Sequence, residues 1–289
     1  MPGMTFAPDK ERHLTLAALG HCLQHYGYLR EQAAGLRAPG VPGKSLLIGI
    51  GLDAGVGALW QQFQRHGHWE ADFGVQVARE QLEAEHPGLA LPDVRLEIEA
   101  GIRGYAEQWA DGVRGWEVID VHPYLDPAEH ARLTLRLPDG RQYLCMPDME
   151  VRAGGVLTVV DQKTSAFGYR AEDWAWEPQL LMNSYALAQR TGEPVQYLVD
   201  FMQRPSRYKK GAGVPTWTFP PTEPFPMTLA RMQQADGWLR LAGHRLGLLE
   251  QMPADPAVLR DPAACRTWYG RCEFWETCWG EGAPEGEAT

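Results

Sequence analysis

Apolar positions follow two different periods along this chain. Near its start, in "HLTLAALGHCLQHYGYLREQ", they recur about every three to four residues, which is the period of an amphipathic helix. Between 115 and 203, short apolar runs alternate with turn signals such as "PDG" and "RAGG", which is the pattern of strands. The helical period predicts helices over 10–38, 45–69, 71–84, 99–112, 177–190 and 226–250.

The strand-like part predicts a sheet with helices on its faces. The runs "ARLTLRL", "RQYLCMPDMEV" and "VLTVVDQKT" follow one another closely, and we expect them to form an antiparallel meander. A further strand is expected at 195–203, with "VPTWTFPP" as its hairpin partner. The fold class is therefore α/β, with a central mixed sheet flanked by helices. We expect one domain over 1–289, made of a helical part at 1–114, the sheet core at 115–203 and the remainder at 204–289.

Composition indicates a soluble protein with a sizeable core. Hydrophobic residues make up 44% of the 289 positions and charged residues 22%, which is typical of a globular chain. No run approaches about 18 uncharged apolar residues, and the first residues lack the basic-then-apolar layout of a secretion signal. We expect a cytoplasmic protein without a membrane partner.

The formal net charge of −10 argues against a surface that attracts nucleic acid everywhere. A polyanion would have to meet a local basic patch, and the best candidate is the stretch "RPSRYKK". A solvated loop explains this stretch equally well. The residues that we expect to contact DNA there are Arg204, Arg207, Lys209 and Lys210.

The stretch "MPDMEVRAGGVLTVVDQKTS" places charged residues in strand-like sequence. A two-residue turn favours residues with positive φ, so the two glycines at 154–155 predict the turn of a hairpin. Ala153 then lies opposite Val156, and counting outward along both strands brings Asp148 opposite Asp161. Side chains in such a pair share one face of the sheet, with Cβ atoms about 4.5–5.5 Å apart.

The alternation of side chains along a strand brings Lys163 to the same face, while Gln162 points away. Two ionised carboxylates at this separation repel each other, and a divalent cation such as Mg²⁺ or Mn²⁺ would hold them together, with the Gln162 carbonyl as a further ligand. An aspartate–lysine salt bridge on an exposed sheet face is the alternative. Pro147 is expected in a bulge, which could shift the register.

The "PD" at 147–148 and the "DQK" at 161–163 resemble the signature of the PD-(D/E)XK nuclease superfamily, and "VVDQKTS" is similar to its RecB-like branch. The resemblance implies a restriction-endonuclease-like core. It also implies that the catalytic set around Mg²⁺ or Mn²⁺ is formed by Asp148, Asp161 and Lys163.

Two other elements resemble the family less closely. The glycine-rich segment "GIGLDAGVGALW", which we expect to pack closely against a neighbour, resembles a helix that carries a histidine near the metal. Asp53 takes the place of that histidine and could bind the metal, or it could be a capping or surface residue. The family pairs a glutamine with a tyrosine four residues later, whereas here Gln179 precedes Tyr185 by six. Gln179 is kept as the candidate.

Three cysteines gather in the tail "CRTWYGRCEFWETC" and a fourth lies near the start of the chain. This clustering favours a metal over disulfides, and the absence of a close cysteine pair favours a [4Fe-4S] cluster over zinc. Zinc binding and ordinary thiols without a metal are the alternatives. AddB and the CRISPR-adaptation nucleases, which are RecB-like, show a similar layout, and it implies a cluster joining the termini. The ligands would be Cys22, Cys265, Cys272 and Cys278, whereas Cys145 reads as a core residue.

The resemblance as a whole implies a metal-dependent DNA nuclease, most simply an exonuclease on DNA ends or single strands. No nucleotide-binding loop of a motor occurs in the sequence, so a helicase or recombinase would be a separate partner. Tryptophans in "EDWAWEP" could stack on bases or pack in the core. The alternatives are a nuclease-like subunit that binds DNA without cutting it, and a hydrolase of another class such as a phosphatase or glycosidase.

Overall fold

The chain divides into two compact units in a computed structural model. The first unit comprises Met1–Pro2, Pro42–Leu135 and Leu144–Asp236, and the second comprises Gly3–Val41, Arg136–Tyr143 and Gly237–Thr289. The structure describes residues 13–14, 44–87, 92–109, 115–121, 133–136, 142–145, 147–166, 168–204, 216–251, 266–267 and 270–271.

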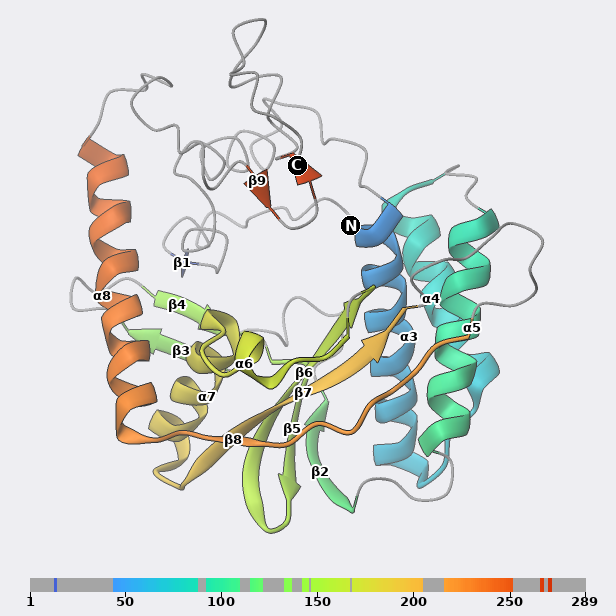
Figure 1. Cartoon of the computed structure of the whole chain (residues 1–289), viewed down its shortest axis with the longest axis horizontal. Coiled ribbons are helices and arrows are strands. Elements are labelled where there is room, and N and C mark those ends of the chain that lie inside the picture. Colours follow the sequence, from blue (N-terminus) through green and yellow to red (C-terminus); the bar gives the residue numbers. More distant parts are fainter. Residues whose placement is uncertain are drawn as a thin grey trace, which may run out of the picture. The chain divides into compact units, whose positions relative to one another are not determined.

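A five-stranded mixed sheet forms the centre of the first unit, as the sequence predicts (Figure 1). Its order is β2-β5-β6-β7-β8, and every neighbouring pair is antiparallel except β6 and β7, which run parallel. The parallel pair is possible because a helix crosses between the two strands. The strands are β2 (Trp116–Val121), β5 (Met149–Ala153), β6 (Val156–Ser165), β7 (Val195–Gln203) and β8 (Phe225–Pro226).

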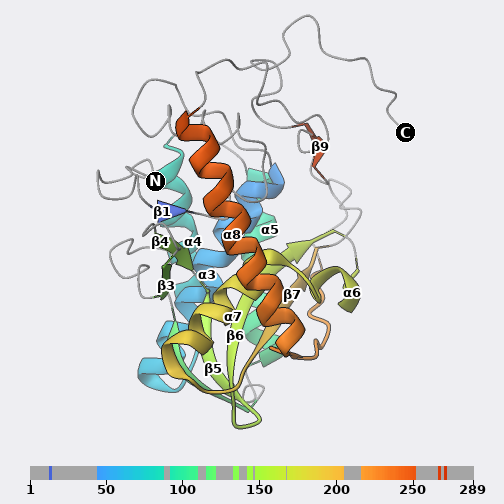
Figure 2. The ribbon, with the colours of Figure 1, turned by 90° about the vertical axis from the view of Figure 1, so that its left-hand side faces the viewer.

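Helices cover both faces of this sheet (Figures 1 and 2). Helices α3, α4 and α5 pack on one another at one face, and α7 lies against β6 and β7 at the other. A short α6 precedes α7, and α8 begins in the first unit. Their bounds are α3 (Lys44–His66), α4 (Ala71–Glu85), α5 (Pro92–Trp109), α6 (Ala171–Trp174), α7 (Pro178–Thr191) and α8 (Leu229–Gln251).

Helix α3 is the main core helix on its side of the sheet. Its side chains Leu52 and Trp60 are fully buried, together with Ile102 of α5 and Val151 of β5. By length and composition α3 is, of the described helices, the one that could also cross a membrane, but 56% of its apolar window is buried inside the protein. Its apolar surface is therefore used for packing the core of this unit.

A buried chain of hydrogen bonds connects these helices to the sheet. The hydroxyl of Tyr105 on α5 donates to Asp200 Oδ2 on β7 at 2.5 Å, and it accepts a hydrogen bond from Trp60 Nε1 on α3 at 2.8 Å. Buried polar groups need such partners, because an unpaired group loses its water without compensation. The network therefore holds α3 and α5 at one position over β7.

Several elements differ from the sequence prediction. Helix was expected at 10–38, and this is wrong at β1 (His13–Leu14), where the backbone pairs in parallel with β4 (Gln142–Cys145) within the second unit. The expected meander is confirmed for the antiparallel pair β5 and β6 and is wrong before it, because β2 pairs directly with β5 and β3 (Leu133–Arg136) does not join the five-stranded sheet.

Other boundaries shift for local reasons. Helix α5 begins at Pro92 rather than near 99, because proline fits the first helical position and Asp93 follows it in the first turn. The expected hairpin partner of β7 is reduced to one bridge, between Gln203 and Thr218, and β8 pairs elsewhere on β7. A small antiparallel pair in the tail is formed by β9 (Arg266–Thr267) and β10 (Gly270–Arg271).

The glycines of α3 allow a close approach to its neighbours, as expected. A Cβ on Gly55 would lie 2.3 Å from Ile102 Cδ1 and 3.0 Å from the backbone oxygen of Gly74. A Cβ on Gly57, two residues along the same helix, would meet no atom within 4 Å. The two glycines therefore differ in packing while sharing the same helical backbone.

We predict opposite effects for alanine at these two positions. Gly55→Ala should lower the free energy of unfolding by about 1–3 kcal/mol, because the added methyl overpacks the contact with α4 and α5. Gly57→Ala should raise it by about 0.5–1 kcal/mol, because alanine restricts the unfolded chain and fits the helix. Urea denaturation of the two variants beside wild type measures both values. Equal effects at both sites would contradict the close helix packing.

Candidate active site

The hairpin that carries the acidic residues has the predicted register. Ala153 pairs with Val156 and Met149 pairs with Val160, on either side of the glycine turn at 154–155. Both glycines have positive φ, at 59° and 82°, as a tight two-residue turn requires. Pro147 lies just before the strand and leaves the register of β5 and β6 unchanged.

The first two aspartates meet at the open end of this hairpin. The Asp148 carboxylate accepts a hydrogen bond from the backbone N–H of Gln162 on β6. Asp161, on the same strand as Gln162, is fully buried and forms an ion pair with Lys163 through Oδ2. Asp161 Oδ1 has no hydrogen-bond partner among the described residues. A buried carboxylate oxygen without a partner is costly, and it indicates a site made for a ligand.

Lys163 is held from a second direction by the start of α7. Its Nζ donates to Gln179 Oε1 at 3.0 Å, which places the candidate glutamine beside the candidate lysine. Glu177 caps the helix, with Oε2 accepting from the Leu180 N–H at 2.8 Å, and Pro178 occupies the first helical position. Sequence reasoning missed Glu177, although a capping residue followed by proline is a helix-start signal.

Asp53 joins the same electrostatic group from α3. Burial, then the charge of Asp161, raises the pKa of Asp53 to about 7, while Lys163 acts in the opposite direction. Burial likewise raises the pKa of Asp148 well above its usual value, with further contributions from Asp161 and Asp53. The charge of Asp161 on β6 therefore lies close enough to Asp53 and Asp148 to disfavour the ionised forms of those two carboxylates.

Lys163 stays protonated in this setting. Burial lowers its pKa, but the neighbouring charges of Asp161 and Asp148 outweigh burial and raise the pKa above its ordinary value. An ammonium group donates hydrogen bonds and stabilises negative charge, but it cannot accept a proton. The arrangement therefore suits Lys163 for holding an anion or a water rather than for acting as a base.

The donor atoms suit a hard divalent cation. Carboxylate oxygens are the ligands that Mg²⁺ and Mn²⁺ prefer, and Asp161 Oδ1 has its lone pairs available among the described residues. No group of three or more His, Cys, Asp or Glu side chains in the described part of the chain is arranged to hold a metal ion. The oxygen donors present are of the kind that such an ion binds, and Asp148 and Asp161 are the best candidate pair of ligands.

Most of the other predicted ligands lie outside the described residues. This is true of Arg207, Lys209 and Lys210 in the basic loop, and their contact with DNA stays a prediction. The four proposed iron–sulfur ligands are also outside, namely Cys22, Cys265, Cys272 and Cys278. Cys145 is described and buried, with Sγ 3.4 Å from the Met182 carbonyl oxygen, which confirms it as a core residue.

Arg204, the remaining residue of the predicted DNA patch, is engaged inside the protein. Its Nε lies 2.6 Å from Glu97 Oε2, and the opposite oxygen of that fully buried carboxylate lies 2.5 Å from Lys44 Nζ. Ser45 Oγ accepts a further hydrogen bond from Arg204 at 3.4 Å. Arg204 therefore connects the end of β7 to the starts of α3 and α5.

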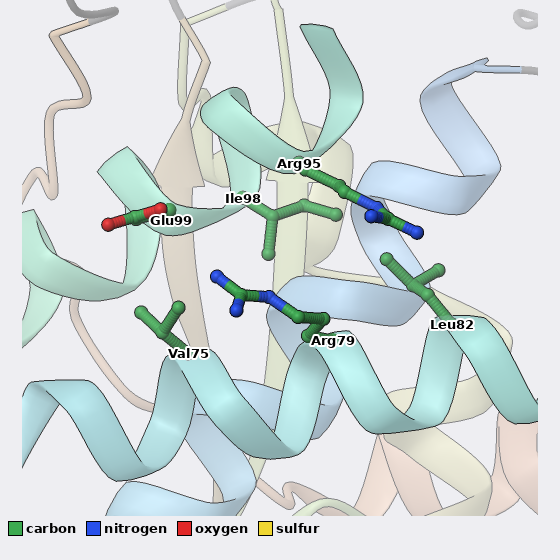
Figure 3. A pocket seen from close by; sticks show the side chains of 6 residues that line it. All are labelled: Val75, Arg79, Leu82, Arg95, Ile98 and Glu99. Atoms are coloured by element: carbon green, nitrogen blue, oxygen red, sulfur yellow. The ribbon is translucent and has the colours of Figure 1, made fainter. Parts of the chain in front are cut away.

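A shallow pocket lies apart from this site, between α4 and α5 (Figure 3). Two of its charged residues are paired with near neighbours, since Arg95 binds Glu83 at 3.0 Å and Glu99 binds Arg103 at 3.0 Å. None of the candidate catalytic residues lines it. The pocket lining is Val75, Arg79, Leu82, Arg95, Ile98 and Glu99.

Comparison with known proteins adds little to this geometry. No protein family matches the sequence, and no curated protein is similar to it at a significant level. One similar solved structure is the crystal structure of a protein from Eubacterium rectale that is named a putative exonuclease. It shares 12% identity, covers 98% of this chain and 94% of that chain, and has a TM-score of 0.48. At this identity and TM-score the likeness carries no argument about function.

We predict that Arg204→Ala destabilises the protein. Removing this cation weakens the compensation of the buried Glu97 charge, and the free energy of unfolding should fall by about 2–4 kcal/mol in urea denaturation. Arg103→Ala is the matched control, because Arg103 is exposed and binds Asp72 at 2.7 Å and Glu99 at 3.0 Å. The control should cost at most about 0.5 kcal/mol. Similar small losses in both variants would show that Arg204 is not needed for the fold.

We predict that Asp53→Asn stabilises the metal-free protein at pH 8. The pKa of Asp53 is about 7 in the folded protein and 3.8 as a model value, so the folded state binds its proton more tightly than the unfolded chain. Wild type should therefore gain stability as the pH falls through 7, and Asp53→Asn should lack this gain. The difference at pH 8 should be on the order of 1 kcal/mol in denaturation with a chelator present.

Glu172→Gln provides the control for this experiment, because Glu172 is an exposed carboxylate on α6. The free energy of unfolding of this variant should match that of wild type at both pH 8 and pH 6. An Asp53→Asn protein that is less stable than wild type at pH 8 would contradict the electrostatic crowding.

Proposed function

We propose that this protein is a metal-dependent DNA nuclease that hydrolyses phosphodiester bonds. The observation that carries the proposal is the buried Asp161, whose Oδ1 lacks a partner among the described residues. Burial and then the charge of Asp161 raise the pKa of Asp148 and Asp53 beside it. Among the described residues of the site, Lys163 is the one cation that offsets the negative charge of these carboxylates. A divalent cation would relieve their repulsion, and phosphodiester hydrolysis uses such an ion beside a cationic side chain.

Each residue has a role that follows from its contacts. Asp148 and Asp161 would hold Mg²⁺ or Mn²⁺, with Asp53 and the Gln162 carbonyl as further ligands. The ion would lower the pKa of an attacking water and neutralise charge on the phosphate. Lys163 would donate to the phosphate oxygen on which negative charge develops, since it remains protonated between the acidic groups.

Gln179 acts through Lys163. Its Oε1 accepts a hydrogen bond from the Lys163 ammonium at 3.0 Å, and the same ammonium forms an ion pair with Asp161, so Lys163 is held from α7 as well as from its own strand. Glu177 supports this role by capping the same helix turn. We class Gln179 as a positioning residue, because among the described residues its side chain contacts Lys163 rather than the carboxylates of Asp148 and Asp161.

The choice of DNA as substrate rests on the resemblance of the "PD" and "DQK" motifs to RecB-like nucleases. The finer parts of the proposal are an exonuclease activity on ends or single strands and a cytoplasmic role in recombination, repair or phage DNA metabolism beside a helicase or recombinase. A [4Fe-4S] cluster, or zinc, at the four cysteines belongs to the same proposal and rests on their spacing alone.

We predict that purified protein degrades end-labelled DNA when Mg²⁺ or Mn²⁺ is present and not when a chelator is present. Asp161→Asn and Lys163→Ala should each lower the cleavage rate by roughly 10³-fold, because each removes a group that stabilises the transition state. Gln179→Ala should lower it by about 10–100-fold, as expected for a group that orients a reacting side chain. Gel electrophoresis of single- and double-stranded substrates measures these rates.

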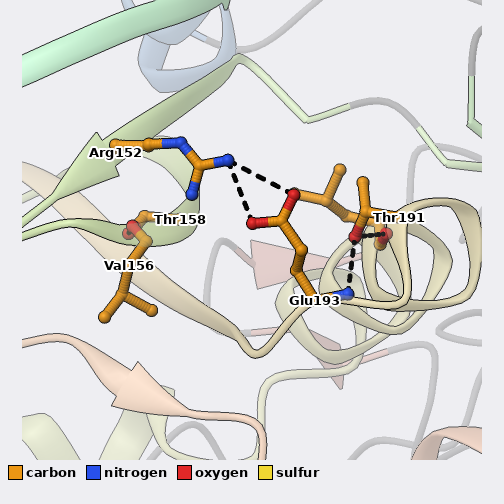
Figure 4. Close-up of polar contacts among 6 residues, drawn as sticks. Arg152, Val156, Thr158, Thr191 and Glu193 are labelled. Carbon is orange, nitrogen blue, oxygen red and sulfur yellow. Dashed lines mark hydrogen bonds and ion pairs between the residues drawn. The ribbon is translucent and has the colours of Figure 1, made fainter.

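Arg152→Ala is the matched control, because Arg152 lies on the same hairpin near its turn. Its guanidinium binds the Glu193 carboxylate at 3.0 and 3.3 Å (Figure 4). Arg152 pairs with Leu157 near the turn, whereas Asp148 precedes the opposite end of β5. This variant should cleave DNA at the wild-type rate. DNA binding without cleavage by folded wild type on every substrate would replace the nuclease by a DNA-binding subunit.

A further inference from the structure

Trp176 is an exposed aromatic residue that lies, along the chain, just before the helix carrying Gln179. Its side chain is 52% exposed, although tryptophan carries one of the largest apolar surfaces of any residue. It directly precedes Glu177, which caps α7, and lies three residues before Gln179, which holds Lys163. Trp176 therefore directly precedes the start of the helix whose Gln179 binds the proposed catalytic lysine.

Arg231 holds this indole in place. The guanidinium carbon lies 5.3 Å from the centre of the Trp176 ring, within cation–π range. Arg231 itself is anchored by two backbone oxygens, because its Nε donates to Ala175 O at 3.1 Å and its Nη1 donates to Pro226 O at 2.7 Å. The ring is thus fixed by an anchored cation without being covered by the core.

The same arginine rests on a second aromatic layer. Its guanidinium lies 5.6 Å from the ring of Tyr197 and 5.4 Å from that of Phe225, and these two rings stack on each other at 5.1 Å. The hydroxyl of Tyr197 donates to the Ala175 carbonyl, next to Trp176, at 2.5 Å. Because these contacts already restrain the Trp176 ring, binding a flat ligand would cost little side-chain entropy.

A fixed, exposed indole backed by a cation matches the chemistry of an unpaired nucleobase. Bases present flat π faces that stack on tryptophan in a sequence-tolerant manner, and a nearby arginine adds attraction for the phosphate backbone. In a duplex these faces are already stacked on neighbouring bases. An isolated stacking residue therefore selects single strands or frayed ends.

We propose that Trp176, supported by Arg231, is a stacking site for an unpaired base of a single-stranded nucleic acid whose backbone reaches Lys163. The inference rests on the proposed function and deepens it, because it assigns the strand preference of the same site to one side chain. A base on Trp176 would fix the strand beside the start of α7. The chemistry at Asp148 and Asp161 would be unchanged.

The test compares binding of three fluorescein-labelled probes in the presence of a chelator, so that no cleavage takes place. The probes are a single-stranded oligothymidylate, an oligonucleotide of equal length made of abasic sugar phosphates, and a blunt duplex. Trp176→Ala should weaken binding of the oligothymidylate by about 10-fold, whereas Trp176→Phe, which keeps a ring, should retain most of the affinity. The abasic probe should bind Trp176→Ala and wild type equally.

Leu229→Ala is the matched surface control, because Leu229 is 73% exposed and also apolar. It should bind all three probes as wild type does, and circular dichroism and thermal melting should show that every variant is folded. Fluorescence anisotropy gives the dissociation constants. Unchanged oligothymidylate binding by Trp176→Ala would overturn the stacking site, as would an equal loss on the abasic probe.

Cleavage assays on the same proteins separate this inference from the proposed function. A wild type that cuts DNA, with unchanged binding by Trp176→Ala, would overturn the stacking site and leave the nuclease proposal in place. A wild type that binds oligothymidylate through Trp176 but never cuts would overturn the nuclease and support the stacking site. Failure of wild type to bind any single strand would overturn the stacking site.

Discussion

The structure of the candidate site depends on the repulsion among carboxylates at the open end of one hairpin. Asp161 is fully buried, and burial together with the charge of Asp161 raises the pKa of both Asp148 and Asp53. Lys163 offsets this repulsion only in part, since it is a single ammonium shared with Gln179. A fold that keeps such an arrangement gives up stability at this point, which is common where residues are selected for binding or chemistry.

The packing of the first unit brings together carboxylates that are carried by different elements. Asp53 comes from α3, and its position is set by how that helix packs on α5 and the sheet. Tyr105 fixes this packing through buried hydrogen bonds to Trp60 and Asp200. The absence of a side chain at Gly55 lets the helices approach closely. Buried hydrogen bonds and close helix packing therefore set the distance from Asp53 to the other two aspartates, and the electrostatics of the site depends on that distance.

The segment 176–179, which leads into α7, serves the site in two ways. Gln179 points inward to Lys163, and the preceding Trp176 is exposed on an arginine that is anchored to the backbone. Glu177 between them caps the helix by accepting a hydrogen bond from the Leu180 N–H. One short segment thereby couples the position of the proposed catalytic lysine to the position of the proposed base-stacking surface.

The sequence by itself determined the hairpin and its acidic pair. A two-glycine turn and the alternation of strand side chains act over about twenty residues, so Asp148, Asp161 and Lys163 could be brought together by counting. Only the tertiary structure decided that β2 pairs with β5, that Arg204 binds Glu97 far away in the chain, and that Trp176 lies on Arg231. These features depend on contacts between distant segments, and no local period or turn signal specifies which distant partner a strand or a charge will meet.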